Sequence, residues 1–276
     1  MDLRHSTRAF SRGLILWIGP QKIARIRAIG DAAAHMKPIS LTERYAILTE
    51  NEGWFGSAAP EFQQAVLSRC GWREVMAGQP IYSASDVQTD PCGIVDGTAE
   101  IYSRYGAGDN PMLHLSHEGS WVGYGAVVRG QPLRVSVVAR TSVLLASVPR
   151  RAMQDLLCER PEWWRFIAGA ALEYGDIAAS GYADSLIQAS DRRCASRLLR
   201  IAGLLFPRRS RPEQQSVPVT QDELATLVNV SRTTLLQILR RFEDRGLVEQ
   251  AYRALRVVDA AGLADIAAGR ESQPLG

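Results

Sequence analysis

The feature that most constrains the fold is a change of hydrophobic pattern at Pro149. Before this proline, short apolar runs are separated by glycines. After it, apolar residues recur at every third or fourth position. Short turn-bounded runs are typical of antiparallel strands, and the second spacing is typical of amphipathic helices. A chain of 276 residues is long enough to bury a core in both parts. We therefore predict an α+β protein with an all-β module followed by helices.

The all-β module is expected from about Trp54 to Val148. A short helix over residues 60–67 precedes the strands. The strands are predicted at residues 80–82, 93–95, 99–102, 112–115, 121–122, 134–139 and 142–148. Their close, turn-bounded spacing favours an antiparallel barrel or sandwich.

A long helix is predicted over residues 162–188, after a short helix over 150–158. Its apolar stripe is formed by Trp163, Phe166, Ile167, Ala170, Tyr174 and Ile177. Glycines and alanines beside this stripe would let another helix approach closely. Two interpretations remain: the stripe is a dimer interface, or it packs on the chain's own β-module. Trp163 and Trp164 could line a pocket for an apolar effector, but core packing is favoured for them.

Two short helices joined by a tight turn are predicted near the C-terminus, after an amphipathic helix over residues 192–206. Thr220 and Glu223 have the spacing of a capping box. Asn229 suits the turn, and Ser231 can cap the second helix. The second helix has an inner face at Leu235, Ile238, Leu239 and Phe242. This pattern predicts a helix-turn-helix.

The second helix directs polar side chains outward, as expected of a recognition helix in the major groove. They are Arg232, Thr233, Gln237, Arg240 and Arg241. Arginine can pair with guanine and glutamine with adenine, while threonine can use its hydroxyl or its methyl. Residues 248–250 and 255–258 predict a small hairpin, whose Tyr252 and Arg253 could touch phosphate or the minor groove.

The charge distribution agrees with a DNA-binding C-terminal part. Residues 191–258 hold 13 arginines and seven acidic residues, a surplus of +6, whereas the whole chain carries only +3. The rest of the chain is therefore slightly acidic, at −3. Attraction to phosphates belongs to the C-terminal part.

Several segments, taken in order, resemble the Crp/Fnr-type transcription regulators from Trp54 to about Ile266. The segments are residues 77–82, 94–97 and 119–123, the helix start at Pro161, and Leu224-Ala225 with residues 231–234. The resemblance implies a cyclic-nucleotide-binding-like β-roll as sensor, a long dimerisation helix and a C-terminal winged helix-turn-helix. The corresponding boundaries are 53–160, 161–190 and 191–268, with an extension at 1–52 and a tail at 269–276.

This resemblance implies a homodimer on double-stranded DNA, with RNA polymerase as a further partner. Ser231, Thr234 and Arg241 are expected to hold phosphates, and Arg232, Thr233 and Gln237 to read bases. The best-known branch commonly has Glu and Arg at the last two positions, so we expect a shifted half-site. A signal at the β-roll or the long helix would change the pose of the DNA-binding domains, although constitutive binding stays open.

The expected effector pocket departs from the cyclic-AMP-binding branch. That branch has Gly-Glu followed by Arg-Ser or Arg-Thr, whereas this chain has Gly123-Tyr124-Gly125 and then Arg134-Val135. Ala178 and Ala179 stand where hydroxyls would meet the adenine. Ordinary cyclic AMP recognition is therefore not expected. Arg134 could still neutralise an anion, or serve only as a structural arginine.

The cofactor remains unknown from the sequence. The cysteines at positions 70, 92, 158 and 194 lack the clustering of an iron–sulfur or zinc site, and suit reduced thiols. His114 and His117 are the best metal or haem candidates, but their spacing on a strand points them to opposite faces. We expect no metal site.

Two other functional classes were weighed against DNA binding. A nucleotide-binding module that regulates a partner protein would need an intact Gly-Glu cassette and no recognition helix. An enzyme would need a catalytic motif, and none of the common ones occurs. We expect neither. We also expect no membrane span, no secretory signal and a cytoplasmic location, because the apolar run 14–18 is far too short to span a bilayer.

Residues 1–52 are predicted to be a basic extension. They carry Arg4, Arg8, Arg12, Lys22, Arg25 and Arg27 before Asp31. Either the segment touches nucleic acid as a flexible arm, or it lacks regular structure, with a biological start at Met36. The second interpretation is favoured.

Overall fold

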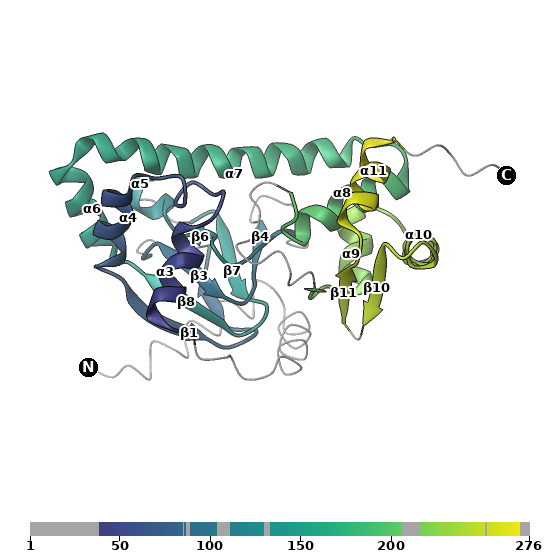
Figure 1. The fold of residues 1–276 in the computed structure, drawn as a ribbon, viewed down its shortest axis with the longest axis horizontal. Coiled ribbons are helices and arrows are strands. Elements are labelled where there is room, and N and C mark those ends of the chain that lie inside the picture. Colours follow the sequence, from purple (N-terminus) through teal and green to yellow (C-terminus); the bar gives the residue numbers. More distant parts are fainter. Residues whose placement is uncertain are drawn as a thin grey trace. The chain divides into compact units, whose positions relative to one another are not determined.

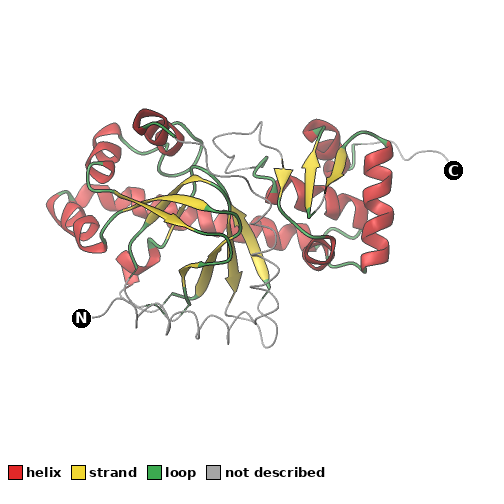
Figure 2. Cartoon of the chain, turned by 90° about the horizontal axis from the view of Figure 1, so that it is seen from below, coloured by secondary structure: helices red, strands yellow, loops and turns green. Residues whose placement is uncertain are grey.

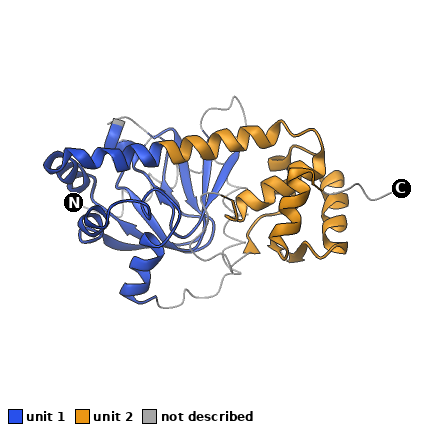
Figure 3. Ribbon diagram, turned by 45° about the horizontal axis from the view of Figure 1, so that its top comes forward, with its two compact units in different colours: residues 1–171 blue, residues 172–276 orange. Residues whose placement is uncertain are grey.

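The structure is a computed structural model that describes residues 39–84, 86, 89–103, 111–129, 133–205, 216–251 and 253–270. It divides into two compact units, residues 1–171 and 172–276 (Figure 3). The greater part of the expected basic extension, residues 1–38, lies outside the described residues, as do residues 271–276 of the expected tail.

Unit 1 is built on two four-stranded antiparallel sheets (Figures 1 and 2). The first has the order β1 (Gly71–Val75), β8 (Val143–Ser147), β3 (Cys92–Asp96) and β6 (Trp121–Val122). The second has the order β2 (Pro80–Tyr82), β7 (Val135–Ala139), β4 (Ala99–Ser103) and β5 (Met112–Ser116). Neighbouring strands in both sheets pair antiparallel, so the predicted β-module is confirmed.

Gly97 makes the tight connection between β3 and β4. Its φ is +85°, a left-handed conformation that glycine adopts without a steric penalty. A Cβ atom placed there would lie 2.3 Å from the backbone oxygen of Ser142. The glycine is therefore required both by its conformation and by the close approach of a neighbouring chain segment.

The helices of unit 1 cover an aromatic core. They are α3 (Leu41–Thr49), α4 (Pro60–Leu67), α5 (Gly125–Arg129), α6 (Arg150–Glu159) and the first part of α7 (Trp164–Ser185), after a 3-10 turn at Pro161–Trp163. Phe55 and Trp121 stack with ring centroids 4.5 Å apart, and Trp163 meets the edge of Phe62 at 5.4 Å. The first contact joins the segment before α4 to β6, and the second joins α4 to the 3-10 turn that precedes α7.

Three elements of unit 1 differ from the sequence prediction. Helix α3 lies inside the expected extension, where Ile47 and Leu48 are buried in the core. Strand β1 was not predicted, because four of its five residues are exposed or half-buried and form no apolar run. Helix α5 was not predicted either, because it spans only five residues and starts at Gly125.

A buried polar cluster ties β4 to the end of β7. Arg140 forms an ion pair with Glu100, and both side chains are fully buried. The Tyr102 hydroxyl donates to the same carboxylate at 2.5 Å. Such a pair is costly to bury, but removing one partner would leave an uncompensated charge.

Unit 2 contains the end of α7 and a compact set of helices with one small sheet. The elements are α8 (Ser190–Ile201), β9 (Ser216–Val217), α9 (Gln221–Val228), α10 (Arg232–Asp244), β10 (Val248–Ala251), β11 (Ala254–Val257) and α11 (Ala260–Ala268). The sheet has the order β10-β11-β9, and the β10–β11 hairpin runs from the pair Val248 and Val257 to the pair Ala251 and Ala254. Helix α11, which was not predicted, packs on α8.

Helix α8 ends before the predicted boundary. Gly203 has a φ of +68°, and its N–H donates to the Arg200 oxygen at 3.0 Å. The Leu204 N–H donates to the Leu199 oxygen at 2.9 Å. These two bonds form a Schellman motif, which closes a helix although the apolar spacing continues. Within the described residues, no helix combines the length and apolar character needed to cross a membrane.

Candidate nucleic-acid interface

The first helix of the two-helix motif, α9, begins with a complete capping box. The Thr220 hydroxyl accepts from the Glu223 N–H at 3.3 Å, and the Glu223 carboxylate accepts from the Thr220 N–H at 2.9 Å. Both free backbone donors are therefore satisfied by side chains. The capping box predicted from the sequence is confirmed.

The turn between the helices depends on Asn229 and Ser231. Asn229 adopts a left-handed conformation with φ of 55°, which asparagine tolerates better than most residues. Ser231 caps α10 by accepting from the Thr234 N–H at 3.1 Å. The hydroxyls of Ser231 and Thr234 also lie 2.9 Å apart. The turn therefore gives α10 a fixed start.

The inner faces of α9 and α10 are buried. The residues that form them are Leu224, Ala225, Val228, Leu235, Ile238, Leu239 and Phe242. The four that lie on α10 are those predicted as its inner face. Their burial holds α10 against α9 and leaves the opposite side of α10 to solvent.

The exposed side of α10 carries the predicted DNA-contacting residues. Arg232, Thr233, Gln237 and Arg241 are exposed, as is Ser231 at the cap. Thr234 is half-buried, because its hydroxyl lies against Ser231. The helix thus brings the predicted base-reading residues and Ser231 and Arg241 to one surface.

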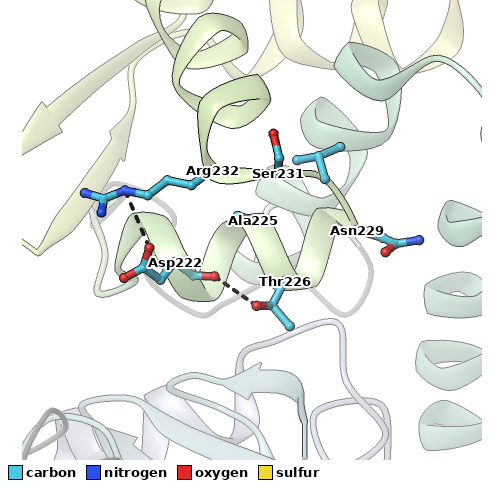
Figure 4. Close-up of a pocket in the computed structure, with 7 residues that line it drawn as sticks. Asp222, Ala225, Thr226, Asn229, Ser231 and Arg232 are labelled. Atoms are coloured by element: carbon cyan, nitrogen blue, oxygen red, sulfur yellow. Dashed lines mark hydrogen bonds and ion pairs between the residues drawn. The ribbon is translucent and has the colours of Figure 1, made fainter.

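Arg232 is oriented by side chains of α9, and Figure 4 shows its contact with Asp222. Its Nε lies 3.5 Å from Oδ1 of Asp222, and its Nη2 donates to Oε1 of Gln221 at 3.3 Å. An open pocket of about 660 Å³ lies between α9 and the start of α10. It is lined by Asp222, Ala225, Thr226, Asn229, Val230, Ser231 and Arg232. Sequence reasoning missed the roles of Gln221 and Asp222, although their place in the first turn of α9 could have suggested them.

The predicted hairpin is present as β10 and β11. Arg253 lies at its tip with a left-handed φ of 54° and is half-buried. Tyr252, the other predicted contact residue, lies outside the described residues. Arg256 pairs with Glu249 across the hairpin at 2.6 Å.

The residues expected around an effector belong to the loop after β6, to α5 and to the start of β7 in unit 1. Tyr124 donates its hydroxyl to the Ala170 oxygen of α7 at 3.1 Å, so it reaches toward the helix. A Cβ at Gly123 would lie 2.7 Å from the Tyr82 hydroxyl, which shows how closely that ring covers the loop. Burial raises the pKa of Tyr82 well above its usual value, so its hydroxyl stays protonated. The remaining members are Gly125 at the start of α5, Arg134, which is exposed, and Val135, which begins β7.

The two candidate metal-binding histidines also lie in different surroundings. His117 is buried, with its Nδ1 3.3 Å from the Thr98 hydroxyl, whereas His114 is half-buried on β5. Among the described residues, no group of three or more His, Cys, Asp or Glu side chains is placed to hold a metal ion.

The residues of the apolar stripe predicted on the long helix lie in two different environments. Trp163, Ile167 and Ala170 are buried in the core of unit 1, and Phe166 packs against it. Tyr174 and Ile177 are half-buried. The predicted core role of Trp163 agrees with its burial, whereas Trp164 is exposed. Because the first part of the stripe meets its own β-module, these residues are not free to meet a second subunit.

Comparisons with known proteins match both parts of the chain. The model of the cyclic nucleotide-binding domain matches residues 72–160, and that of the Crp-like helix-turn-helix domain matches residues 192–266. A curated relative is the CRP-like cAMP-activated global transcriptional regulator of Mycobacterium tuberculosis. The two are 23% identical over 171 residues, which are 62% of this chain and 76% of the relative.

Solved structures show the same fold. A Crp/Fnr-family transcriptional regulator of Thermus thermophilus is 19% identical, with a TM-score of 0.55 over 73% of this chain and 100% of the other. The c-di-GMP-responsive global regulator CLP of Xanthomonas campestris is 16% identical, with a TM-score of 0.53 over 73% of this chain and 100% of the other. With a cyclic nucleotide-binding β-roll followed by a Crp-like helix-turn-helix, this chain belongs to the Crp/Fnr-type family of transcription regulators.

Proposed function

We propose that the chain acts as a homodimer that binds a specific DNA sequence through α10. The observation that carries this proposal is the exposed surface of the first two turns of α10, where Arg232, Thr233 and Gln237 stand on a helix fixed by Ser231 and by a buried inner face. A helix held in this way can place its N-terminal side chains against base edges in the major groove.

The side chains of α10 divide into two roles. Ser231, Thr234 and Arg241 hold phosphates and set the register of the helix on DNA. Arg232, Thr233 and Gln237 read bases, with Arg232 on guanine and Gln237 on adenine. Since Thr233 and Gln237 replace the residues common in the best-known branch, the preferred half-site is shifted.

The dimer face lies on the exposed part of α7. Leu172, Gly175, Ala179 and Tyr182 are exposed and follow each other at intervals of three and four residues. Leu172 is 70% exposed and Tyr182 68%. This spacing is that of a coiled-coil seam, in which small residues allow close approach. RNA polymerase is a further proposed partner, through the family resemblance alone.

Control by cyclic AMP of the usual kind is not part of the proposal. The relative from Mycobacterium tuberculosis is named as cAMP-activated. In this chain Tyr124 replaces the expected carboxylate and is bonded to α7, and Tyr82 covers Gly123. We propose that adding cyclic AMP leaves DNA affinity unchanged, and a clear tightening would contradict this.

Binding-site selection with the full-length protein tests the proposed function. We expect a roughly palindromic site with half-sites one helical turn apart. Arg232→Ala should cost about 1–3 kcal/mol and relax the preference at one base pair of each half-site. Arg270→Ala, which removes an exposed arginine of another ion pair in unit 2, is the matched control and should leave the preference unchanged. Equal selection by wild type and Arg232→Ala would show that the assigned face is wrong.

A further inference from the structure

A continuous series of hydrogen-bonded polar side chains links the β10–β11 hairpin, which we call the wing, to the start of α10. The Glu243 carboxylate accepts from the Gln250 side-chain amide at 2.8 Å. Oε1 of Gln250 accepts from the amide nitrogen of Gln221 at 3.0 Å. Oε1 of Gln221 accepts from Nη2 of Arg232 at 3.3 Å, and Oδ1 of Asp222 lies 3.5 Å from Nε of the same guanidinium. This series of side chains therefore joins α10, the wing and α9, and it ends on Arg232, which is proposed to read bases.

The Glu243 carboxylate and the Arg232 guanidinium fix the direction of every bond between them, one from each end. An ionised carboxylate only accepts hydrogen bonds, so Gln250 must turn its NH2 group toward Glu243. Gln250 must then present its oxygen to Gln221. Gln221 must in turn donate with its NH2 group and present its oxygen outward. This orientation agrees with the one that Arg232 requires, because a guanidinium only donates hydrogen bonds.

The contacts on Arg232 use one edge of its guanidinium. Asp222 and Gln221 meet Nε and Nη2. Neither contact uses Nη1. Guanidinium has five N–H donors in a fixed plane, so Nη1 and the second hydrogen of Nη2 form a remaining fork. A fork of this kind matches O6 and N7 of guanine.

We propose that Gln221 and Asp222 are positioning residues that fix the guanidinium plane of Arg232 and so determine base preference. This inference rests on the proposed function of Arg232. Without the Gln221 acceptor and the Asp222 ion pair, the flexible arginine reaches nearby phosphates as easily as a base. Phosphate contacts raise affinity for all sequences and carry no sequence information. Asp222 also places a negative charge beside the DNA surface, which disfavours binding that does not engage Arg232.

The Asp222–Arg232 contact could instead be an ordinary surface ion pair. Its side chains are 52% and 62% exposed, and such pairs contribute little to stability. The Arg270–Asp265 pair, at 65% and 49%, is similarly exposed and also lies in unit 2, where Asp265 belongs to α11 and Arg270 follows that helix. Asp265→Asn therefore removes the same charge and the same kind of pair without touching Arg232. It is the matched control for Asp222→Asn.

The experiment measures relative affinities for the selected site and for sites changed at one base pair each. Arg232→Ala first identifies the base pair that Arg232 reads. We expect Asp222→Asn and Gln221→Leu to reduce the preference at that same base pair by about two- to fivefold, the size of one exposed ion pair. Preference at the Gln237 position should not change, and affinity for unrelated DNA should rise for Asp222→Asn. Glu243→Gln should weaken the same base preference less than Gln221→Leu does, because Arg232 still fixes the direction of the bonds from the other end.

Several outcomes separate the possible explanations. Asp222→Asn in an Arg232→Ala background should have no further effect on base preference. With Arg232 present, Asp222→Glu should retain part of the base preference that Asp222→Asn loses. The positioning role is wrong if Asp222→Asn has the same base preferences as Asp265→Asn. It is also wrong if Asp222→Asn changes the preference at all base positions equally. If wild-type protein selects no sequence at all, the proposed function itself fails. Thermal unfolding of each variant tests whether a loss of base preference comes from a loss of folding.

Discussion

At the scale of single residues, Asp184 shows how unit 2 holds the end of α7 against α8. Its carboxylate accepts from Nε of Arg200 at 2.7 Å and from the Ser196 hydroxyl at 2.6 Å. The Asp184 side chain is only 6% exposed. Burial lowers the pKa of the neighbouring Arg197, and Asp184 counteracts that shift. One carboxylate therefore compensates two arginines that have lost much of their hydration.

Removing this carboxylate should be costly. We expect Asp184→Ala to lower the free energy of unfolding by about 3 kcal/mol, because a nearly buried charge loses its partner. Asp155→Ala removes a carboxylate from an exposed pair with Arg151 and should cost less than about 0.5 kcal/mol. Urea denaturation of the two variants measures the difference. Equal losses would show that burial does not strengthen the Asp184 contacts.

At the scale of elements, the α9–turn–α10 motif depends on the backbone as well as on side chains. Asn229 ends α9 in a left-handed conformation, and the Val230 N–H donates back to the Ala225 oxygen at 3.0 Å. Arg193 of α8 donates to the Val228 oxygen at 2.6 Å. The same turn therefore sets where α10 begins and is supported from α8.

Substitutions at Asn229 should reveal the cost of this conformation. Asn229→Ala should destabilise unit 2 by about 1 kcal/mol, because a Cβ penalises the left-handed region and alanine has no compensating polar side chain. Asn229→Gly should stay within about 0.5 kcal/mol of wild type, because glycine adopts this region freely. Thermal unfolding monitored by circular dichroism compares them. A larger loss for glycine than for alanine would contradict the backbone explanation.

At the scale of the whole molecule, α7 takes part in both units. Its first part contributes Ile167 and Ala170 to the core of unit 1, and its last part is bonded to α8 through Asp184. With 22 residues the helix is about 33 Å long. Between those contacts it exposes the proposed dimer face, so a second copy would meet a helix that is already held at both ends.

A charge placed in the proposed dimer face should separate the subunits. We expect Leu172→Arg to shift the protein from dimer to monomer in sedimentation velocity, because two arginines would meet across the seam. Affinity for a site with two half-sites should fall by about 100-fold, since the two contacts no longer act together. Met76→Arg changes another exposed apolar residue, 59% exposed, and should leave both measurements unchanged. A dimeric Leu172→Arg variant would place the interface elsewhere.

Local patterns in the sequence were sufficient to predict much of the fold and the exposed surface of α10. The glycine-bounded runs predicted the strands from β2 to β8, and Thr220, Asn229 and Ser231 predicted the two-helix motif. These signals are local, because strand alternation, helix caps and turn residues act within a few positions. Strand β1 and helices α3 and α11 were missed, because their stability comes from packing against distant segments.

The sequence by itself determined the types and order of most elements and the face of α10 that carries Arg232, Thr233 and Gln237. Only the tertiary structure decided which surface each apolar stripe meets. Trp163, Ile167 and Ala170 are buried in unit 1, whereas Leu172 and Tyr182 on the same helix are exposed. It also brought Glu243, Gln250 and Gln221 into one chain ending at Arg232. The reason is that periodicity records how residues repeat along one element, while contacts between elements depend on how the chain folds back on itself.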